Sequence, residues 1–460
     1  MKRHLVCIAL GFAVSVTGWA QQFVVKPANP ILFGEPVAIS VRGLPKGQDV
    51  KIISERAIVD ETGNGKTILY RAEAVFSVGP DGIVDLALAV PKSGTYKGAD
   101  ARGLFWSMQP VADGEVTDRK QMVVRLEVRI STDTKRDDKP IASTLIEFVD
   151  ALPGVKTEVV GKLPGALFAT LAAAGEISIK RPAVILLGGS EGGNYVARGA
   201  ASLASYGFAV LALPYYSPAD GPTGKAEFPT LPRSFADIPI DRLEEARAWL
   251  QTRDDVDASR IAVRGVSKGA EFALLAGVYM PWITAIVAVV PSDVVWEGWG
   301  EGIEPGKRSS FSYRRQTLPF VPYADFGREF VGYQTGEPVR IRRPQDKGRA
   351  ANPAAAVAAR IPVEKIKAPV MVVAGQDDQL WNSAMMAHNI AERRAEAKLD
   401  TVSLIYTDAG HLLSGTGYDP TTQYDVGLSM VGGTPAGNAR AQADAWPKTI
   451  QFLKRTLGMK

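Results

Sequence analysis

The sequence predicts two domains of different class: a β-sandwich of about immunoglobulin size, followed by a mostly parallel β-sheet covered by helices on both faces. Three observations lead to this prediction. Short segments in which apolar and polar residues alternate fill roughly the first third of the chain. Fully apolar segments that alternate with helical patterns fill the rest. The length of 460 residues suits about two or three domains.

The N-terminus has the features of a secretory signal peptide. A basic start, Lys2–His4, precedes an apolar run from Leu5 to Val16, and Gly18 and Ala20 are the small residues expected before a cleavage site. We therefore expect residues 1–20 to be removed and the protein to be periplasmic or secreted. An uncleaved N-terminal anchor is the alternative.

The residue counts exclude several kinds of chemistry. The one cysteine, Cys7, would leave with the signal peptide, so the mature chain would have no disulfide, thiolate nucleophile or cysteine-based metal site. Two histidines would remain, His388 and His411, and their separation matches no short metal-ligand spacing. The net charge of +4 is too small for a nucleic-acid-binding surface. We therefore expect no metal, no cofactor and no nucleic acid.

Residues 21–133 are expected to form the β-sandwich. The segments Val37–Val41 and Val124–Ile130 alternate in the way of half-buried strands, and turn signals such as Gly63–Gly65 separate the strand candidates. The polar run Thr132–Lys139 is the expected domain boundary.

Residues 134–460 are expected to form the second domain. Its apolar strand candidates alternate with helical segments, which is typical of a parallel sheet with both faces covered. The expected strands are Ala183–Leu187, Phe208–Leu213, Ile261–Arg264, Val370–Val373 and Val402–Tyr406, and the expected helices are Tyr195–Ser205, Asp241–Gln251, Ala270–Tyr279 and Asn382–Arg394.

Two other stretches of this domain need an interpretation. Phe272–Pro291 is apolar and long enough to cross a membrane, but Pro281 divides it, so we expect a buried helix followed by a core strand and no membrane span. Residues 300–350 are irregular and rich in arginine and lysine, and we expect a lid-like insertion there. Its cations could bind phosphates, or they could be a solvated surface, which is the interpretation that we favour.

A G-x-S-x-G pentapeptide, Gly265–Gly269, lies between a predicted strand and a predicted helix. A turn this sharp forces the serine into strained dihedral angles and leaves no room for side chains at the two glycines. A second match, Gly188–Gly192, also lies between a strand and a helix. In an α/β-hydrolase the nucleophile follows the loop that supplies an oxyanion donor, so Ser267 is the predicted nucleophile. The alternative is that Ser267 is an ordinary helix N-cap.

The predicted oxyanion hole uses backbone N–H groups on both sides of the nucleophile. The earlier, glycine-rich loop would supply one donor from Gly189, Ser190 or Glu191, and the Lys268 N–H would supply the other.

The acid and the base should follow the nucleophile in the order Asp or Glu, then His. Asp377 and Asp378 come directly after one predicted strand, and His411 follows the next strand. Because the carboxyl ends of parallel strands meet at one edge of the sheet, these side chains can converge on Ser267. We prefer Asp378 as the acid, with Asp377 in a structural role. His388 lies within a predicted helix and is expected to be a surface or packing residue.

Several stretches of the sequence resemble the acyl-CoA thioesterase / bile acid-CoA:amino acid N-acyltransferase family. Those proteins combine an N-terminal β-sandwich with a C-terminal α/β-hydrolase domain. The stretches that carry the resemblance are Gly94–Gly98, Gly103–Met108, Gly207–Leu213, Tyr215–Tyr216, Val266–Glu271, Pro291–Trp296, Gly375–Asp378 and Ala443–Trp446.

The resemblance implies that Ser267, Asp378 and His411 occupy the family's nucleophile, acid and base positions. The N-acyltransferase members use cysteine as nucleophile, so the serine of this chain implies hydrolysis by water. Glu191 departs from the family pattern, since the animal members tend to have glycine there. The signal peptide departs as well, because coenzyme A is not expected outside the cytoplasm.

The leading hypothesis is therefore a serine hydrolase of the acyl-CoA thioesterase type, acting on a small-molecule acyl thioester. The first alternative keeps the same site for an exported carboxylic-ester hydrolase that does not use coenzyme A. The second is a non-catalytic binding protein whose β-sandwich has the main role.

Overall fold

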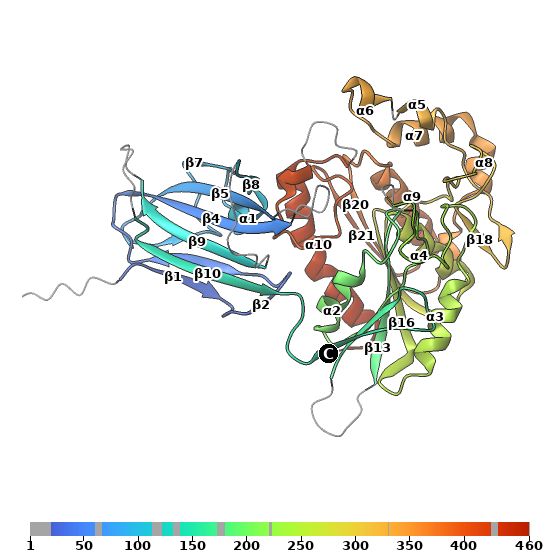
Figure 1. The fold of residues 1–460 in the computed structure, drawn as a ribbon, viewed down its shortest axis with the longest axis horizontal. Coiled ribbons are helices and arrows are strands. Elements are labelled where there is room, and N and C mark those ends of the chain that lie inside the picture. Colours follow the sequence, from blue (N-terminus) through green and yellow to red (C-terminus); the bar gives the residue numbers. More distant parts are fainter. Residues whose placement is uncertain are drawn as a thin grey trace, which may run out of the picture.

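The computed structural model describes most of the 460-residue chain. The described ranges are 20–59, 67–112, 122–131, 139–172, 180–219, 223–329, 331–424 and 431–459. The predicted signal peptide, apart from its last residue, lies outside these ranges. The chain folds into an N-terminal β domain and a larger α/β domain, which lie next to each other in Figure 1.

The β domain consists of two sheets that enclose one apolar core. Alternation explains the core. Every second residue is buried from Val50 to Arg56 in the long strand β4 (Asp49–Val59) and from Tyr70 to Phe76 in β5 (Thr67–Ser77). The smaller sheet has the order β1 (Gln22–Lys26), β3 (Ala38–Arg42) and β6 (Val84–Asp85). The larger sheet has the order β2 (Ile31–Leu32), β10 (Ala142–Val149), β9 (Val123–Ile130), β4, β5 and β7 (Ser93–Gly94), and β8 (Gln109–Pro110) also pairs with β5.

One short helix, α1 (Gly103–Trp106), lies among these strands and is buried along its whole length. It belongs to the Gly103–Met108 stretch that carries the family resemblance.

The expected boundary between residues 133 and 134 requires a correction. Strand β10 pairs antiparallel with β9 over the register from Ala142 opposite Val128 to Glu147 opposite Val123. The polar run that follows β9 therefore connects two strands of one sheet instead of two domains. The β domain continues to Val149, and the next strand, β11 (Val155–Val159), already belongs to the other domain.

The α/β domain is built on an eight-stranded sheet. Its first three strands in space are antiparallel neighbours, and all the following neighbours are parallel. The order is β11, β12 (Leu167–Leu171), β14 (Ala209–Ala212), β13 (Arg181–Leu187), β16 (Val256–Val266), β17 (Ile283–Val289), β20 (Val370–Gly375) and β21 (Thr401–Tyr406). This is the mostly parallel α/β sheet that the sequence predicts, in the arrangement of an α/β-hydrolase.

Helices cover both faces of this sheet (Figure 1). Helices α3 (Arg242–Gln251), α4 (Lys268–Tyr279) and α9 (Ser383–Glu396) pack on one face in a single apolar cluster. Helices α2 (Ala197–Ala204) and α10 (Pro435–Thr456) pack on the other face in a second cluster. The sequence did not indicate α10, whose interior contains a proline.

The apolar stretch Phe272–Pro291 forms the end of α4 and then the core strand β17, as expected. Among the described residues, no helix combines the length and the apolar character needed to cross a membrane.

The insertion at residues 300–350 is more regular than the sequence suggests. It contains β18 (Phe311–Tyr313), β19 (Gln316–Thr317), α5 (Phe326–Glu329), α6 (Gly332–Thr335) and α7 (Arg342–Ala351), and β18 pairs with β15 (Ile238–Pro239). Helix α8 (Pro353–Ala358) follows it.

Several cations of this insertion form ion pairs with carboxylates. The pairs are Arg308–Asp237, Arg342–Asp346, Arg343–Glu329, Lys347–Asp325 and Arg349–Asp293. This pairing agrees better with a folded surface element than with a phosphate clamp.

Candidate active site

Ser267 lies at the sharp turn between β16 and α4, with φ 57° and ψ −122°. Few non-glycine residues adopt a positive φ, and such strain persists only where neighbouring structure enforces it. A Cβ on Gly265 would lie 2.0 Å from the Gly269 carbonyl oxygen, and one on Gly269 would lie 2.2 Å from the Gly188 carbonyl oxygen. A side chain at either glycine would therefore clash with backbone atoms, and no movement of a side chain could relieve the clash.

The glycine-rich loop after β13 packs directly against the serine. A Cβ on Gly189 would lie 3.2 Å from the Ser267 Cβ. On the other side, the Ser267 amide donates to the Val289 carbonyl at the end of β17, at 2.9 Å. Lys268 is the first residue of α4, so its N–H has no helical carbonyl four residues earlier to accept it. The structure thus places the predicted oxyanion loop and the start of α4 on either side of the serine.

One predicted oxyanion donor is already in use. The Gly189 N–H donates to the Glu191 carboxylate at 2.8 Å. The Tyr215 hydroxyl lies 2.7 Å from the Gly188 carbonyl oxygen, and burial holds the pKa of this tyrosine well above its ordinary value, so the hydroxyl remains a neutral donor. Tyr215 and the Glu191 carboxylate therefore both fix the loop through hydrogen bonds to its backbone.

Asp378 and His411 are brought together at the carboxyl edge of the sheet. The Asp378 Oδ2 lies 2.8 Å from the His411 Nδ1, and both side chains are buried. The other oxygen, Oδ1, accepts from the backbone N–H groups of Leu380 and Trp381 at 3.0 and 3.3 Å. These two bonds orient the carboxylate so that its free oxygen faces the imidazole.

The neighbouring carboxylate has a different environment. Asp377 is exposed, and its oxygens accept from the Gln379 side chain at 2.6 Å and from the Gly433 N–H at 3.0 Å. It therefore fixes the backbone of a nearby loop and does not contact the histidine.

The second nitrogen of His411 has a different environment from the first. Nε2 is buried and has no hydrogen-bond partner within the part of the chain that the structure describes, so no hydrogen bond joins it to the Ser267 hydroxyl. The Trp381 ring lies edge-on to the imidazole, with the ring centroids 5.8 Å apart. His388 is exposed on α9, as expected for a surface residue.

Sequence reasoning missed a buried ion pair directly after the serine. The Lys268 ammonium lies 2.6 Å from the Glu271 carboxylate and 2.9 Å from the Ser310 hydroxyl, and both charged side chains are almost completely buried. Burial lowers the pKa of Lys268 and raises the pKa of Glu271, and in each case the partner's charge opposes this effect. A lysine and a glutamate three residues apart in an otherwise apolar helix were the available signal.

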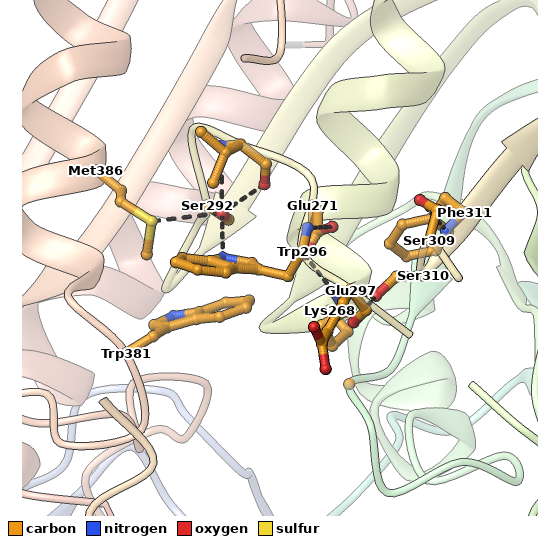
Figure 2. A network of polar contacts seen from close by, with 12 residues as sticks. Lys268, Glu271, Ser292, Trp296, Glu297, Ser309, Ser310, Phe311, Trp381 and Met386 are labelled. Carbon is orange, nitrogen blue, oxygen red and sulfur yellow. Dashed lines mark hydrogen bonds and ion pairs between the residues drawn. The ribbon is translucent and has the colours of Figure 1, made fainter. Parts of the chain in front are cut away.

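This pair connects the start of α4 to a segment rich in tryptophan (Figure 2). The other Glu271 oxygen accepts from the Trp296 N–H at 3.2 Å, and the Trp296 indole N–H donates to Ser292 at 2.9 Å. Trp296 and Trp381 belong to one small apolar cluster, and Trp381 in turn contacts His411. The network therefore extends from the serine helix to the histidine.

Among the described residues, no group of three or more histidine, cysteine, aspartate or glutamate side chains is placed to hold a metal ion.

The strand order and the serine turn define an α/β-hydrolase, and comparisons with known protein families identify which one. Residues 238–459 match the family described as BAAT / Acyl-CoA thioester hydrolase C terminal, and residues 34–162 match the Acyl-CoA thioester hydrolase/BAAT N-terminal region. The chain belongs to this acyl-CoA thioester hydrolase/BAAT family and is a hydrolase, as the resemblance implied.

Curated relatives match nearly the whole chain. Acyl-coenzyme A thioesterase 1 of Rattus norvegicus is 29% identical, with 95% of this chain and 96% of the relative covered. The mitochondrial acyl-coenzyme A thioesterase 2 of Mus musculus is also 29% identical, with 96% and 92% covered. The peroxisomal succinyl-coenzyme A thioesterase of Mus musculus is 28% identical, with 94% and 96% covered.

Solved structures show a more distant likeness. An esterase of Pyrococcus furiosus has a TM-score of 0.39 at 18% identity, with 66% of this chain and 92% of that chain covered. A fungal esterase of Rhizomucor miehei has a TM-score of 0.40 at 14% identity, with 67% and 85% covered. The fold assignment therefore rests on the strand order and not on these likenesses.

Proposed function

We propose that this protein hydrolyses an acyl thioester through a Ser267–His411–Asp378 triad and a covalent acyl-enzyme. One observation carries the proposal. The buried Asp378 carboxylate, oriented by two backbone N–H groups, is hydrogen-bonded to the imidazole of His411, and the imidazole's other nitrogen has no partner among the described residues. An imidazole held in this way is ready to accept a proton from a hydroxyl group.

The proposed reaction has two halves. His411 Nε2 removes the Ser267 hydroxyl proton while the oxygen attacks the acyl carbonyl carbon, and Asp378 stabilises the imidazolium that forms. His411 then returns the proton to the departing thiolate, which leaves the acyl group on Ser267. In the second half His411 removes a proton from water, the hydroxide attacks the acyl carbonyl, and Ser267 recovers its proton as the carboxylic acid leaves.

The oxyanion of each tetrahedral intermediate needs fixed donors. We assign this role to the Lys268 N–H and to the loop of Gly189, Ser190 and Glu191. The Gly189 N–H can serve only after the Glu191 carboxylate leaves it, since one N–H cannot donate fully to both. The loss of one such donor typically costs about 3–4 kcal/mol of transition-state stabilisation.

Coenzyme A is the proposed leaving group because the curated relatives are named for that chemistry. The serine nucleophile supports transfer to water. The sequence of residues 1–20 supports a second candidate, an exported carboxylic-ester hydrolase that does not use coenzyme A.

The test is a hydrolysis assay of the full chain with acyl-CoA esters and with nitrophenyl esters, beside Ser267→Ala as the control. We expect turnover of at least one acyl-CoA and its complete loss in Ser267→Ala. Turnover of nitrophenyl esters but not of acyl-CoA would replace the thioesterase with the exported esterase. No turnover of any acyl donor would overturn both and favour a binding protein.

Two further assignments belong to this proposal. We propose that the N-terminal sheets form an immunoglobulin-like sandwich, which their shared apolar core supports. We also propose export with cleavage before Gln21. N-terminal sequencing of the protein purified from its native host checks the second assignment, and an intact Met1 would contradict it.

A further inference from the structure

The chain that follows His411 leaves the α/β domain and enters the core of the β domain. We call this stretch, residues 411–424, the histidine segment; it ends in the short helix η2 (Thr421–Tyr424). Tyr418 is 1% exposed and belongs to the same apolar cluster as both N-terminal sheets. Its ring centroid lies 5.2 Å from that of Phe105 in α1, edge to face, and 5.2 Å from that of Phe148 in β10. A side chain of the histidine segment is therefore a core residue of the other domain.

Polar contacts fix the orientation of this ring. The Val37 N–H donates to the Tyr418 hydroxyl oxygen at 2.8 Å, and the guanidinium of Arg102 lies 4.6 Å from the ring centroid. Burial raises the pKa of Tyr418, so its hydroxyl stays neutral. The tyrosine is held both by packing and by a hydrogen bond to the β-domain backbone.

Residues next to Tyr418 in the sequence also contact the β domain. Arg56 on β4 is 7% exposed and forms an ion pair with Asp419 at 2.9 Å. Thr422 donates to the carbonyl oxygen of Met108, at the end of the stretch that carries the family resemblance. Contacts of Tyr418, Asp419 and Thr422 thus join the histidine segment to the β domain.

The α/β domain holds the other end of the segment. The His411 N–H donates to the Val431 carbonyl at 2.7 Å, and the Gln442 side chain of α10 donates to the Leu412 carbonyl at 2.7 Å. The same Gln442 accepts from the Gly417 N–H at 3.2 Å. At the far end, the Thr421 hydroxyl donates to the Pro435 carbonyl of α10 at 2.7 Å, and Thr422 contacts the β domain. His411 therefore lies at one end of an irregular stretch that is also anchored, from Tyr418 onward, in a different domain.

We propose that the β domain is a positioning element of the active site and that Tyr418 is the positioning residue through which it holds His411 against Asp378. This inference rests on the proposed function. An irregular segment has many backbone conformations of similar energy, and each anchor removes some of them. A displacement of about 1 Å in a catalytic group can cost about 100-fold in rate, so an anchor in a rigid core has a large effect on turnover.

The matched control is another large apolar residue of the same core that lies away from the segment. Phe76 on β5 is 1% exposed and belongs to the same cluster as Tyr418. Tyr418→Ala and Phe76→Ala both remove a buried ring from the β domain, so both are expected to lower the melting temperature. Only the first removes the anchor of the histidine segment.

The experiment measures kcat, KM, thermal unfolding and the rate of fluorophosphonate labelling for the full chain, with the substrate that the unsubstituted protein turns over. Well below the melting temperature, we expect Tyr418→Ala to lower kcat and the labelling rate by about 10- to 100-fold, with KM changed less than about threefold. Phe76→Ala is expected to keep kcat within about twofold. Equal losses of kcat and labelling rate in the two variants would overturn the positioning role, because a purely stabilising role of the core predicts the same loss for both.

If Tyr418→Ala does not fold, Arg56→Met tests the positioning role instead. It breaks the ion pair to Asp419 and leaves the core rings in place, and we expect a loss of about 3- to 10-fold in kcat. Unchanged kcat and labelling in Arg56→Met would contradict the proposal. If the unsubstituted protein has no activity, the proposed function itself is overturned. Failure of the positioning role and failure of the proposed function can therefore be told apart.

Discussion

The serine and the histidine of the site are positioned in two different ways. The turn at Ser267 is formed by its own neighbours along the chain: β16 before it, α4 after it, and two glycines that permit the turn between them. The remote contacts at this turn are the hydrogen bond from the Ser267 N–H to the Val289 carbonyl and the packing of the Gly188–Gly189 loop. His411 is fixed by groups from remote parts of the chain, among them Asp378 after another strand and Tyr418 in the core of the other domain.

This difference explains why one residue is easy to recognise and the other is not. Backbone sterics impose the glycine pattern around Ser267, so a short motif reports it. No short motif surrounds His411, because its position depends on contacts that only the folded chain brings together. The comparison predicts that local substitutions disturb the nucleophile, whereas distant substitutions disturb the base.

The largest expected effect concerns the carboxylate behind the histidine. Asp378→Asn should lower kcat by about 10,000-fold, because an amide stabilises the wrong imidazole tautomer. Asp377→Asn is the matched control and should change kcat by less than about threefold, since Asp377 is exposed and contacts only loop groups. Steady-state kinetics of both variants decide the assignment, and the reverse pattern would move the acid to Asp377.

The next effect concerns the buried ion pair directly after the serine turn. Lys268→Met should cost about 3–5 kcal/mol of unfolding free energy, because it leaves the buried Glu271 carboxylate without its partner. The double variant Lys268→Met with Glu271→Leu should recover most of that loss, since neither charge of this pair then remains buried without its partner. Urea unfolding measures all three proteins. A single substitution without effect on stability would show that the pair is not coupled.

A smaller effect concerns the backbone beside His411. The Asn438 side chain in α10 accepts from the Gly410 N–H at 2.8 Å, so Asn438→Ala leaves a buried donor unpaired at a cost of about 1–3 kcal/mol. We expect kcat to fall as well, with little change in KM. Asn352→Ala, which removes a side-chain bond to the Gly348 carbonyl in the insertion, should lower stability without lowering kcat. Equal kcat values for both variants would contradict remote positioning of the histidine.

The smallest effect is expected for the other histidine. His388 is exposed on α9, so His388→Ala should change kcat by less than about twofold. If its activity is lost, the base has been assigned to the wrong histidine.

The fold could be predicted where both faces of a strand are buried. The strands at the centre of the α/β sheet are apolar on both faces, and the sequence indicates β13, β14, β16 and β20 for that reason. The edge strand β11 was missed because most of its residues are exposed and show no apolar pattern. Helix α10 was missed because Pro447 interrupts its pattern, although the helix continues through it.

The candidate site could be predicted as far as order along the chain allows. That order suggested Ser267, Asp378 and His411, and the structure joins the last two by a hydrogen bond. It could not reveal that Glu191 covers the Gly189 N–H, since this depends on how one side chain folds back. Nor could it reveal that the histidine segment enters the β domain, because a single buried tyrosine carries no periodic signal.

Fluorophosphonate labelling of the full chain followed by peptide mass spectrometry tests the central claim most directly. Two serines in this chain lie in a G-x-S-x-G pattern, Ser190 and Ser267, and only one of them is at the strained turn. We predict a single adduct on Ser267, formed in parallel with the loss of acyl-ester hydrolysis. An adduct on Ser190, or full hydrolysis after complete labelling of Ser267, would contradict the account.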